Sequence, residues 1–313
     1  MSWVRPGSAW TALWSRVADA STFVLVRTAF AFVIVLDGIT MLPDLELVFA
    51  DGGLNRHPWF FERQYLTPFR WVDGTAVLYA SFGLMMLTGM LAVAGTAVRL
   101  TLPVAAMIHL GLGDYSWPWT FAASYVLSAW TMMLVGACLV TPTRFLGRWP
   151  GAEGRSGVAP LWPLYLIRVQ LVIIYFVTAV ERARGSEWRE GSAVFHALQI
   201  DYYQRFPAPD FFVNSRPLIM LVTWGTLALE FALPALLLHP RTRRIAVGLV
   251  VVLHLGFELF LELGVFGPAM IVGALAFLDP RDSGRILRWM SRRFGAITRI
   301  SVRRPRPVSP GPV

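Results

Sequence analysis

The stretch APLWPLYLIRVQLVIIYFVTAVERARGSEWREG, residues 159–191, decides the class of this protein. Its first part is apolar and long enough to cross a bilayer, whose hydrocarbon core of about 30 Å takes roughly 20 residues of helix. Its second part, from Glu181 onward, is rich in acids and arginines and contains Trp188. A simple membrane anchor needs no such cluster, so the stretch predicts a span that ends in a functional or interfacial group of residues.

The composition of the whole chain indicates a membrane protein with several spans. The 313 residues are 56% hydrophobic and only 15% charged, and the mean hydropathy is +0.55, which fits a soluble globule poorly. We therefore expect an all-α, polytopic membrane bundle with about eight transmembrane helices. The predicted spans cover residues 22–41, 75–98, 100–113, 120–141, 163–180, 217–238, 245–263 and 265–278.

The basic residues are distributed as orientation signals. The formal net charge is +9, and all 28 basic residues are arginine because the chain contains no lysine. The arginine-rich, acid-poor stretches lie at alternate ends of the predicted spans, so the positive-inside rule places both termini in the cytoplasm. Loops 43–73 and 181–216 then lie outside. No RNP box or finger spacing accompanies the charge, so we expect no nucleic-acid binding.

Three regions are predicted along the chain. Residues 1–20 are a cytoplasmic lead-in, in which Trp3 to Val17 have the spacing of an interfacial helix. Residues 21–280 form the transmembrane domain. Residues 281–313 are a basic tail, predicted to place an amphipathic helix on the lipids of an anionic leaflet and to end in a disordered Pro/Arg-rich segment. Cys138 is the only cysteine, which excludes a disulfide framework within one chain.

Four patches of sequence resemble a known family. They are VRTAFAFVIVLDG at 26–38, YSWPW at 115–119, the opening stretch at 159–191, and LHLGFELFLELGVFGPAMI at 253–271. Their order and spacing resemble the membrane region of the vitamin K-dependent gamma-carboxylase family, specifically its bacterial relatives with the HTTM (horizontally transferred transmembrane) domain. The resemblance covers roughly residues 26–280, and it implies a multi-pass protein of the bacterial plasma membrane.

The working residues of the carboxylases are missing. The family has a lysine base near the end of the fifth apolar stretch, where this chain has Glu181 and Arg182. Arginine stays protonated at any relevant pH, so Arg182 cannot take over as a base. The family also has a histidine shortly after a serine–tryptophan pair, and residues 116–120 contain none. We therefore expect neither quinol epoxidation nor carboxylation.

Ionisable side chains within the spans should face protein or water, because each costs roughly 2.5–3.5 kcal/mol near the bilayer centre. Towards the cytoplasmic half, Arg27, Arg168 and Glu230 are predicted to form a structural ion cluster. Towards the outer half, His254 and Glu258 share one helix face. This pair is interpreted as a proton relay, half of a metal site or a satisfied structural pair. Further ligands are lacking, so we predict no metal site.

The outer end of the central span contains the strongest site candidates. Glu181 and Arg182, supported by His254 and Glu258, are the predicted catalytic residues, although arginine and tryptophan also occur as an interfacial belt. The predicted substrate contacts are Asp37, Tyr175 and Trp188.

The sequence leaves two functions open. In the first, the protein binds or modifies a lipid or a quinone-like amphiphile from the extracytoplasmic side. In the second, it is a non-catalytic membrane subunit or scaffold for a partner protein. A transporter is disfavoured because the two halves show no inverted repeat.

Overall fold

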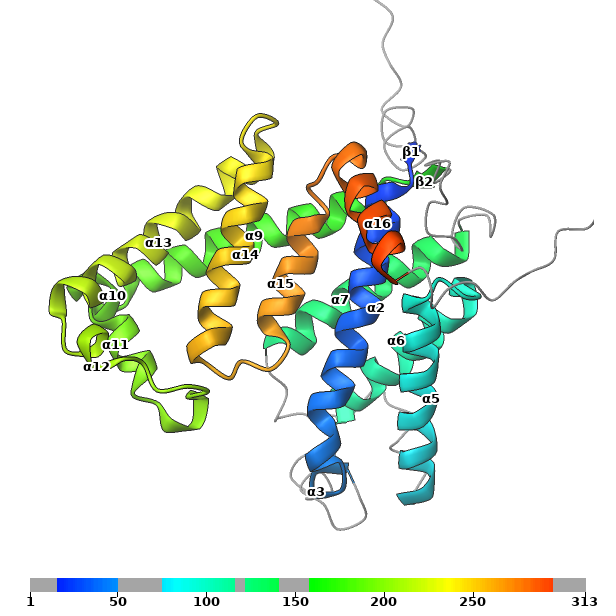
Figure 1. Ribbon diagram of the computed structural model, residues 1–313, viewed down its shortest axis with the longest axis horizontal. Helices are drawn as coiled ribbons and strands as arrows, with labels where there is room; N and C mark the ends of the chain where they lie inside the picture. Colours follow the sequence, from blue (N-terminus) through cyan, green and yellow to red (C-terminus); the bar gives the residue numbers. More distant parts are fainter. Residues whose placement is uncertain (1–15, 50–74, 116–121, 141–157, 295–313) are drawn as a thin grey trace, which may run out of the picture.

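The computed structural model describes residues 16–49, 75–115, 122–140 and 158–294. This part of the chain is mainly helical, which confirms the all-α prediction (Figure 1). Two short strands, β1 (Val17–Asp19) and β2 (Val158–Pro160), pair antiparallel with Ala18 opposite Ala159. The strand pairing corrects the prediction that the interfacial helix extends to Val17, because β1 satisfies its backbone against the segment that precedes α9. The rest of that predicted helix lies outside the described residues.

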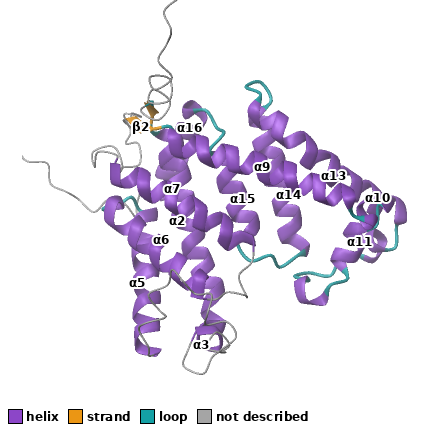
Figure 2. Cartoon of the chain, turned by 180° about the vertical axis from the view of Figure 1, so that it is seen from behind, coloured by secondary structure: helices purple, strands orange, loops and turns teal. Residues whose placement is uncertain are grey.

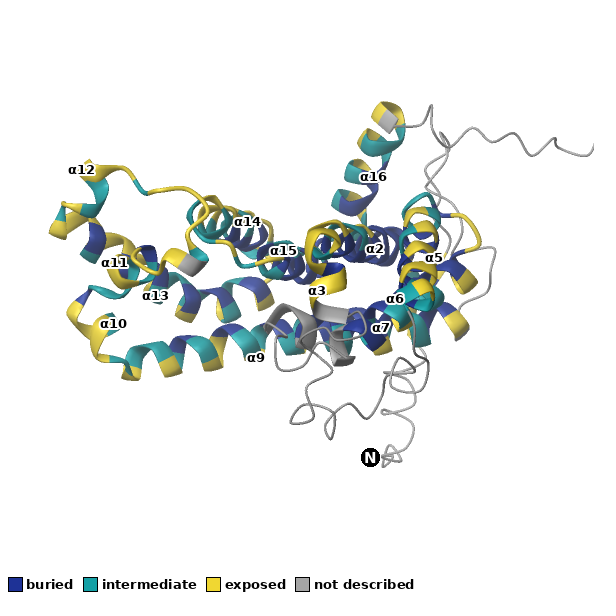
Figure 3. Ribbon diagram, turned by 90° about the horizontal axis from the view of Figure 1, so that it is seen from below, coloured by how far each residue is buried: buried dark blue, intermediate teal, exposed yellow. Residues whose placement is uncertain are grey.

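Helix α2 (Ser21–Met41) is the centre of one half of the molecule. It is apolar on all sides, and most of its side chains are buried, as the dark blue ribbon in Figure 3 shows. A helix that is hydrophobic all round must be surrounded by other elements. The surrounding helices are α5 (Thr75–Val93), α6 (Val98–Tyr115), α15 (Phe266–Leu275) and α16 (Pro280–Phe294).

The other half is built on α9 (Trp162–Arg184), the helix of the opening stretch. Helix α13 (Arg216–Leu238) packs on α9 and on α14 (Arg243–Phe260). Helix α7 (Ala122–Val140) and α15 both contact α9, so they join the two halves (Figure 2). Both α9 and α13 begin with proline in the first turn, where the missing backbone N–H costs no helical hydrogen bond.

Within the described ranges, four helical segments are long and apolar enough to cross a membrane: Ser21–Leu47, Thr75–Val93, Trp162–Arg184 and Arg216–Leu238. The shorter apolar helices are Val98–Leu112, Val126–Leu139 and Phe266–Leu275. Each predicted span thus contains a helix, but length and composition support a crossing for four of them. The count of eight spans and the inward position of both termini stay predictions.

The connections lie at two opposite edges of the helices. In Figure 1, β1, α16 and the turn between α13 and α14 lie at the upper edge, which the sequence predicts to be cytoplasmic. Helix α3 (Leu45–Phe49), which follows the 3₁₀ turn η1 (Leu42–Asp44), lies at the lower edge, and so does the connection between α14 and α15.

The segment predicted as polar loop 181–216 is in fact largely helical. It contains the end of α9, then α10 (Ser186–Glu190), α11 (Ala193–Leu198), the 3₁₀ turn η4 (Asp201–Tyr203) and α12 (Asp210–Val213). Helices α10, α11 and α12 all pack on α13. Of the other predicted loop, 43–73, only the residues up to 49 are described.

Candidate functional site

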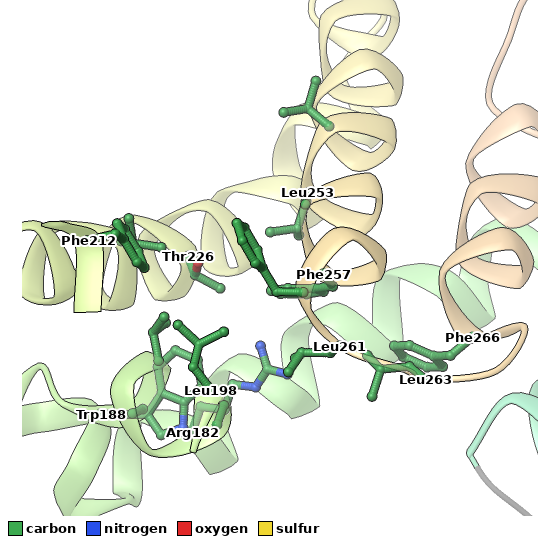
Figure 4. A pocket seen from close by; sticks show the side chains of 17 residues that line it. Arg182, Trp188, Leu198, Phe212, Thr226, Leu253, Phe257, Leu261, Leu263 and Phe266 are labelled. Carbon is green, nitrogen blue, oxygen red and sulfur yellow. The ribbon is translucent and has the colours of Figure 1, made fainter. Parts of the chain in front are cut away.

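A cavity of about 510 Å³ lies where α9 to α12 meet α13, α14 and the start of α15 (Figure 4). Its volume is in the range of small-molecule sites, which are typically 300–1,000 Å³. The walls are mainly aliphatic and aromatic, with Leu198, Phe257, Leu261 and Phe266 among the lining residues. The cavity is therefore suited to the apolar part of a ligand.

Arg182 brings positive charge to this apolar wall. Its guanidinium extends into the cavity from the last turn of α9 (Figure 4). Nη1 donates a hydrogen bond to Oε1 of Glu230, and the guanidinium carbon lies 4.8 Å from the centre of the Trp188 ring. The Arg182 side chain is 28% exposed, whereas that of Glu230 is 4% exposed. Among the described residues no other partner is recorded for the remaining N–H groups of Arg182, so they are available to a ligand.

The position of Trp188 depends on the turn at Gly191. Gly191 has φ +78°, and a Cβ atom there would lie 2.9 Å from Cγ of Met220 and 3.2 Å from the Trp224 ring. Only glycine combines this backbone conformation with such a close approach. The approach lets Trp224 Nε1 donate to the backbone oxygen of Trp188 at 3.1 Å. Helix α10 is thus fixed against α13, which fixes Trp188 beside Arg182.

A second polar contact lies behind the cavity wall. The Tyr175 hydroxyl is 2.8 Å from Nε2 of His254, and both side chains are buried. The His254 ring packs edge-on against Phe257 and Phe266, whose ring centres lie 5.7 and 5.6 Å away and which both line the cavity. Neither Tyr175 nor His254 lines the cavity itself. Their contact links α9 to α14 directly beneath it.

Glu258 holds the rim of the cavity together. Its Oε2 lies 3.2 Å from Nη2 of Arg205, and its Oε1 accepts a hydrogen bond of 3.1 Å from the backbone N–H of Gly267. The backbone N–H of Arg205 also donates to the carbonyl of Phe260 at 2.9 Å. One carboxylate therefore connects α14 to the segment after η4 and to the start of α15, which is a positioning role.

Glu181 lies apart from the cavity although it precedes Arg182 in the chain. It forms an exposed pair with Arg184 at 2.7 Å, in which the side chains are 62% and 71% exposed. Consecutive residues point about 100° apart around a helix, so Arg182 can face the cavity while Glu181 faces out. Nearby in α10, hydrogen bonds from its own backbone N–H and from Ser186 lower the pKa of the Glu187 carboxyl.

The structure does not bring the predicted ion cluster of Arg27, Arg168 and Glu230 together, because each member has a different partner. Arg27 Nη1 donates to the carbonyl of Ala92 at 3.3 Å, and Arg168 Nε donates to the carbonyl of Ala276 at 2.8 Å. Both carbonyls belong to helix C-termini, which carry unpaired C=O groups and partial negative charge. Arginines at these positions need no acid, which leaves Glu230 to pair with Arg182.

Asp37 lies in the other half of the molecule. Its Oδ2 is 2.7 Å from Nε2 of His109 in α6, and both side chains are almost fully buried. No lining residue of the described cavity comes from α2 or α6, so the structure does not place Asp37 with Arg182. His109 was missed as a candidate, although a histidine within an apolar stretch is the same signal that marks His254. Groups of three potential metal ligands are absent from the described part of the chain.

Comparison with known proteins identifies the family. The HTTM domain model matches residues 15–281. The chain belongs to the HTTM domain family. This result confirms the resemblance inferred from the four sequence patches; the likeness to the gamma-carboxylases holds at the family level.

Two curated relatives from Bacillus subtilis (strain 168) are similar to part of the chain. The protein named "Uncharacterized protein YitO" is 26% identical over 160 residues, which is 49% of this chain and 52% of that protein. "Sporulation-delaying protein SdpB" is 29% identical over 136 residues, which is 41% of each. The chain thus spans about half the length of the curated relatives it matches or less. No solved structure matches the chain.

Proposed function

We propose that this HTTM-domain membrane protein binds a lipid or quinone-like amphiphile in the cavity at Arg182, from the extracytoplasmic side. The observation that carries the proposal is an apolar cavity in which Arg182 is the one charged residue among the described lining residues. The apolar body of the ligand packs against the aromatic and aliphatic walls. Its polar head accepts hydrogen bonds from the guanidinium.

The position of the cavity favours a ligand that arrives through the bilayer. Val222 on α13 and Val252 on α14 both line the cavity, yet they are 39% and 69% exposed. Helix α13 is among the segments long and apolar enough to span the membrane. The mouth is therefore bordered by apolar side chains on a surface that lipid would cover. An amphiphile dissolved in the bilayer can enter there without crossing water.

The electrostatics favour a head with an oxygen acceptor. Glu230 is almost fully buried and is paired with Arg182. The carboxylate therefore holds one side of the guanidinium in place, and the other side faces the cavity. Arginine remains a cation and a hydrogen-bond donor, so it can stabilise a carbonyl, carboxylate or phosphate but cannot remove a proton. The scaffold alternative predicted a pocket without converging polar groups, and the Arg182–Glu230 pair at the cavity argues for ligand binding instead.

Two glycines of α14 give a direct test. Gly256 lines the cavity and Gly248 does not, and at both positions a Cβ atom would meet nothing within 4 Å. Gly256→Leu should fill the cavity, whereas Gly248→Leu in the same helix is the matched control. Both changes should be tolerated, because leucine is the better helix former by about 0.5–1 kcal/mol.

The measurement is binding of a short-chain quinone and of dodecanoate to the detergent-purified full-length protein, by native mass spectrometry. We expect at least one of these probes to bind the wild type and Gly248→Leu, and to be lost from Gly256→Leu. Arg182→Gln should weaken the same binding. Equal binding to the wild type and to Gly256→Leu would remove the cavity as the site.

A further inference from the structure

A second, polar cavity lies at the opposite edge of the molecule. It has a volume of about 750 Å³ and lies between the starts of α2, α14 and α16. Its charged lining residues are Asp19, Arg244, Asp279, Arg281, Arg285 and Arg288. We call this cavity the arginine basin. It shares no residue with the cavity at Arg182.

The arginine basin has more positive charge than its acids neutralise. Asp282 pairs with Arg244 at 2.6 Å and with Arg285 at 3.5 Å, while Asp279 pairs with Arg243 at 3.4 Å. No ion pair to any residue that the structure describes is recorded for Arg281 or Arg288. Residues 281, 285 and 288 are spaced four and three apart, so they share one face of α16. Their guanidinium groups are suited to phosphate oxygens, which arginine binds through two parallel hydrogen bonds.

Helix α16 is fixed in place by contacts with α2. Leu287 and Ser283 are fully buried, and Ser283 Oγ lies 3.0 Å from Oγ1 of Thr22. The basin is therefore a built surface and not a row of arginines on a loose tail. Trp289 follows Arg285 by four residues, so it lies beside the arginine face of α16. It is 59% exposed, and exposed tryptophan is typical of the boundary between membrane and water.

The position of the basin along the predicted spans indicates which ligand it binds. Ser21 lines the basin and is also the first residue of the span-length segment Ser21–Leu47. The basin is thus at the end of a predicted span, at the height where lipid phosphates lie. We propose that the arginine basin binds the phosphate of an anionic phospholipid headgroup through Arg281 and Arg288. This site is independent of the amphiphile cavity.

The chain offers a matched pair of double variants. Arg281→Gln/Arg288→Gln removes two charges from the basin, and Arg292→Gln/Arg293→Gln removes two charges from the last turn of the same helix, outside the basin. The full-length protein is stripped of lipid in detergent and titrated with phosphatidylglycerol or phosphatidylcholine, and bound lipid is counted by native mass spectrometry. Circular dichroism of each variant checks that the fold is retained.

We expect the basin variant to bind phosphatidylglycerol roughly 10- to 30-fold more weakly, because it loses the charge-assisted hydrogen bonds of two arginines to the phosphate. The control should change by about twofold or less, and phosphatidylcholine should bind weakly to all forms. Equal loss in both double variants would show diffuse attraction and overturn the site. Complete displacement of phosphatidylglycerol by inorganic phosphate would overturn the lipid as occupant. If the basin variant loses its helical circular dichroism signal, a second variant replaces it. Arg281→Lys/Arg288→Lys keeps both positive charges, so it must still bind phosphatidylglycerol.

Discussion

Two arginines of the predicted spans and their ends, one in each half of the molecule, show what distinguishes a site from a structural charge. Arg182 has a carboxylate partner in Glu230, an aromatic face in Trp188 and N–H groups directed into a cavity. Arg27 is fully buried and donates to one backbone carbonyl, and its Nε and Nη2 atoms have no recorded partner among the described residues. Burial of a cation is therefore a weak sign of function. A paired cation beside a ligand-sized space is a stronger one.

The two arginines also differ in how their charge is compensated. Removing an ion from water costs several kcal/mol, and only well-placed partners offset this. Glu230 provides a full negative charge for Arg182, whereas Arg27 has the partial charge at the C-terminus of α5. Substitutions at the two sites should consequently change stability in opposite directions.

The largest effect is expected for Glu230→Leu. This change leaves Arg182 facing an apolar wall without its acid, and breaking a pair whose acid is almost fully buried costs up to about 3–5 kcal/mol. Thermal unfolding of the detergent-purified protein, followed by circular dichroism, should show a clear drop in the midpoint. The control is Arg182→Met/Glu230→Leu, which should recover most of the stability while losing amphiphile binding. A double variant as unstable as the single one would contradict the pairing.

Arg27→Met should have the opposite sign. Methionine fills a similar volume without the desolvation cost, and such replacements are often neutral or stabilising by about 1–4 kcal/mol. The same unfolding measurement should show an equal or higher midpoint, with amphiphile binding unchanged. Arg99→Met, at an exposed arginine of α6, serves as the control and should give no gain. A lower midpoint for Arg27→Met would mean that the charge of Arg27 is needed in its own right.

Tyr175→Phe tests the contact behind the cavity. The loss of the hydroxyl leaves the buried His254 ring without its recorded partner, which should cost about 1–3 kcal/mol. Tyr165→Phe in the same helix removes a hydroxyl with no hydrogen bond recorded among the described residues, so it should unfold at nearly the wild-type temperature. Identical midpoints for both variants would show that the Tyr175–His254 contact adds no stability.

Much of the fold follows from the lengths of the apolar stretches alone. Each predicted apolar stretch contains a helix, because a lipid-length apolar run can satisfy its backbone only within itself. The boundaries were less predictable: α9 extends through its charged end to Arg184, and the segment after it folds into short helices on α13. Hydropathy says nothing about such packing, since these polar helices are held by tertiary contacts such as that of Gly191 with Met220.

The structure brings four of the predicted site residues together, but the pairing of Glu230 differs from the prediction. Arg182, His254, Tyr175 and Trp188 do gather around one cavity or directly behind it. Position along the predicted span places Glu230 in the inner half of the membrane, but this holds only for a helix that runs parallel to the membrane normal. Figure 1 shows α9 and α13 running obliquely across the other helices, so residues at different predicted depths can meet. Tilt depends on how helices pack, and one sequence does not reveal it.

The smallest effect is expected for Glu181→Gln. This change compares a charged residue outside the cavity with its neighbour inside it. Glu181 and Arg182 are adjacent in sequence, yet only Arg182 lines the cavity. The exposed Glu181–Arg184 pair contributes little, so unfolding should change by no more than about 0.5 kcal/mol. Amphiphile binding should remain at the wild-type level, whereas Arg182→Gln should weaken it. Comparable loss of binding in both variants would mean that the ligand's head reaches the outer face of α9, and the site would then have to include the exposed turn around Glu181.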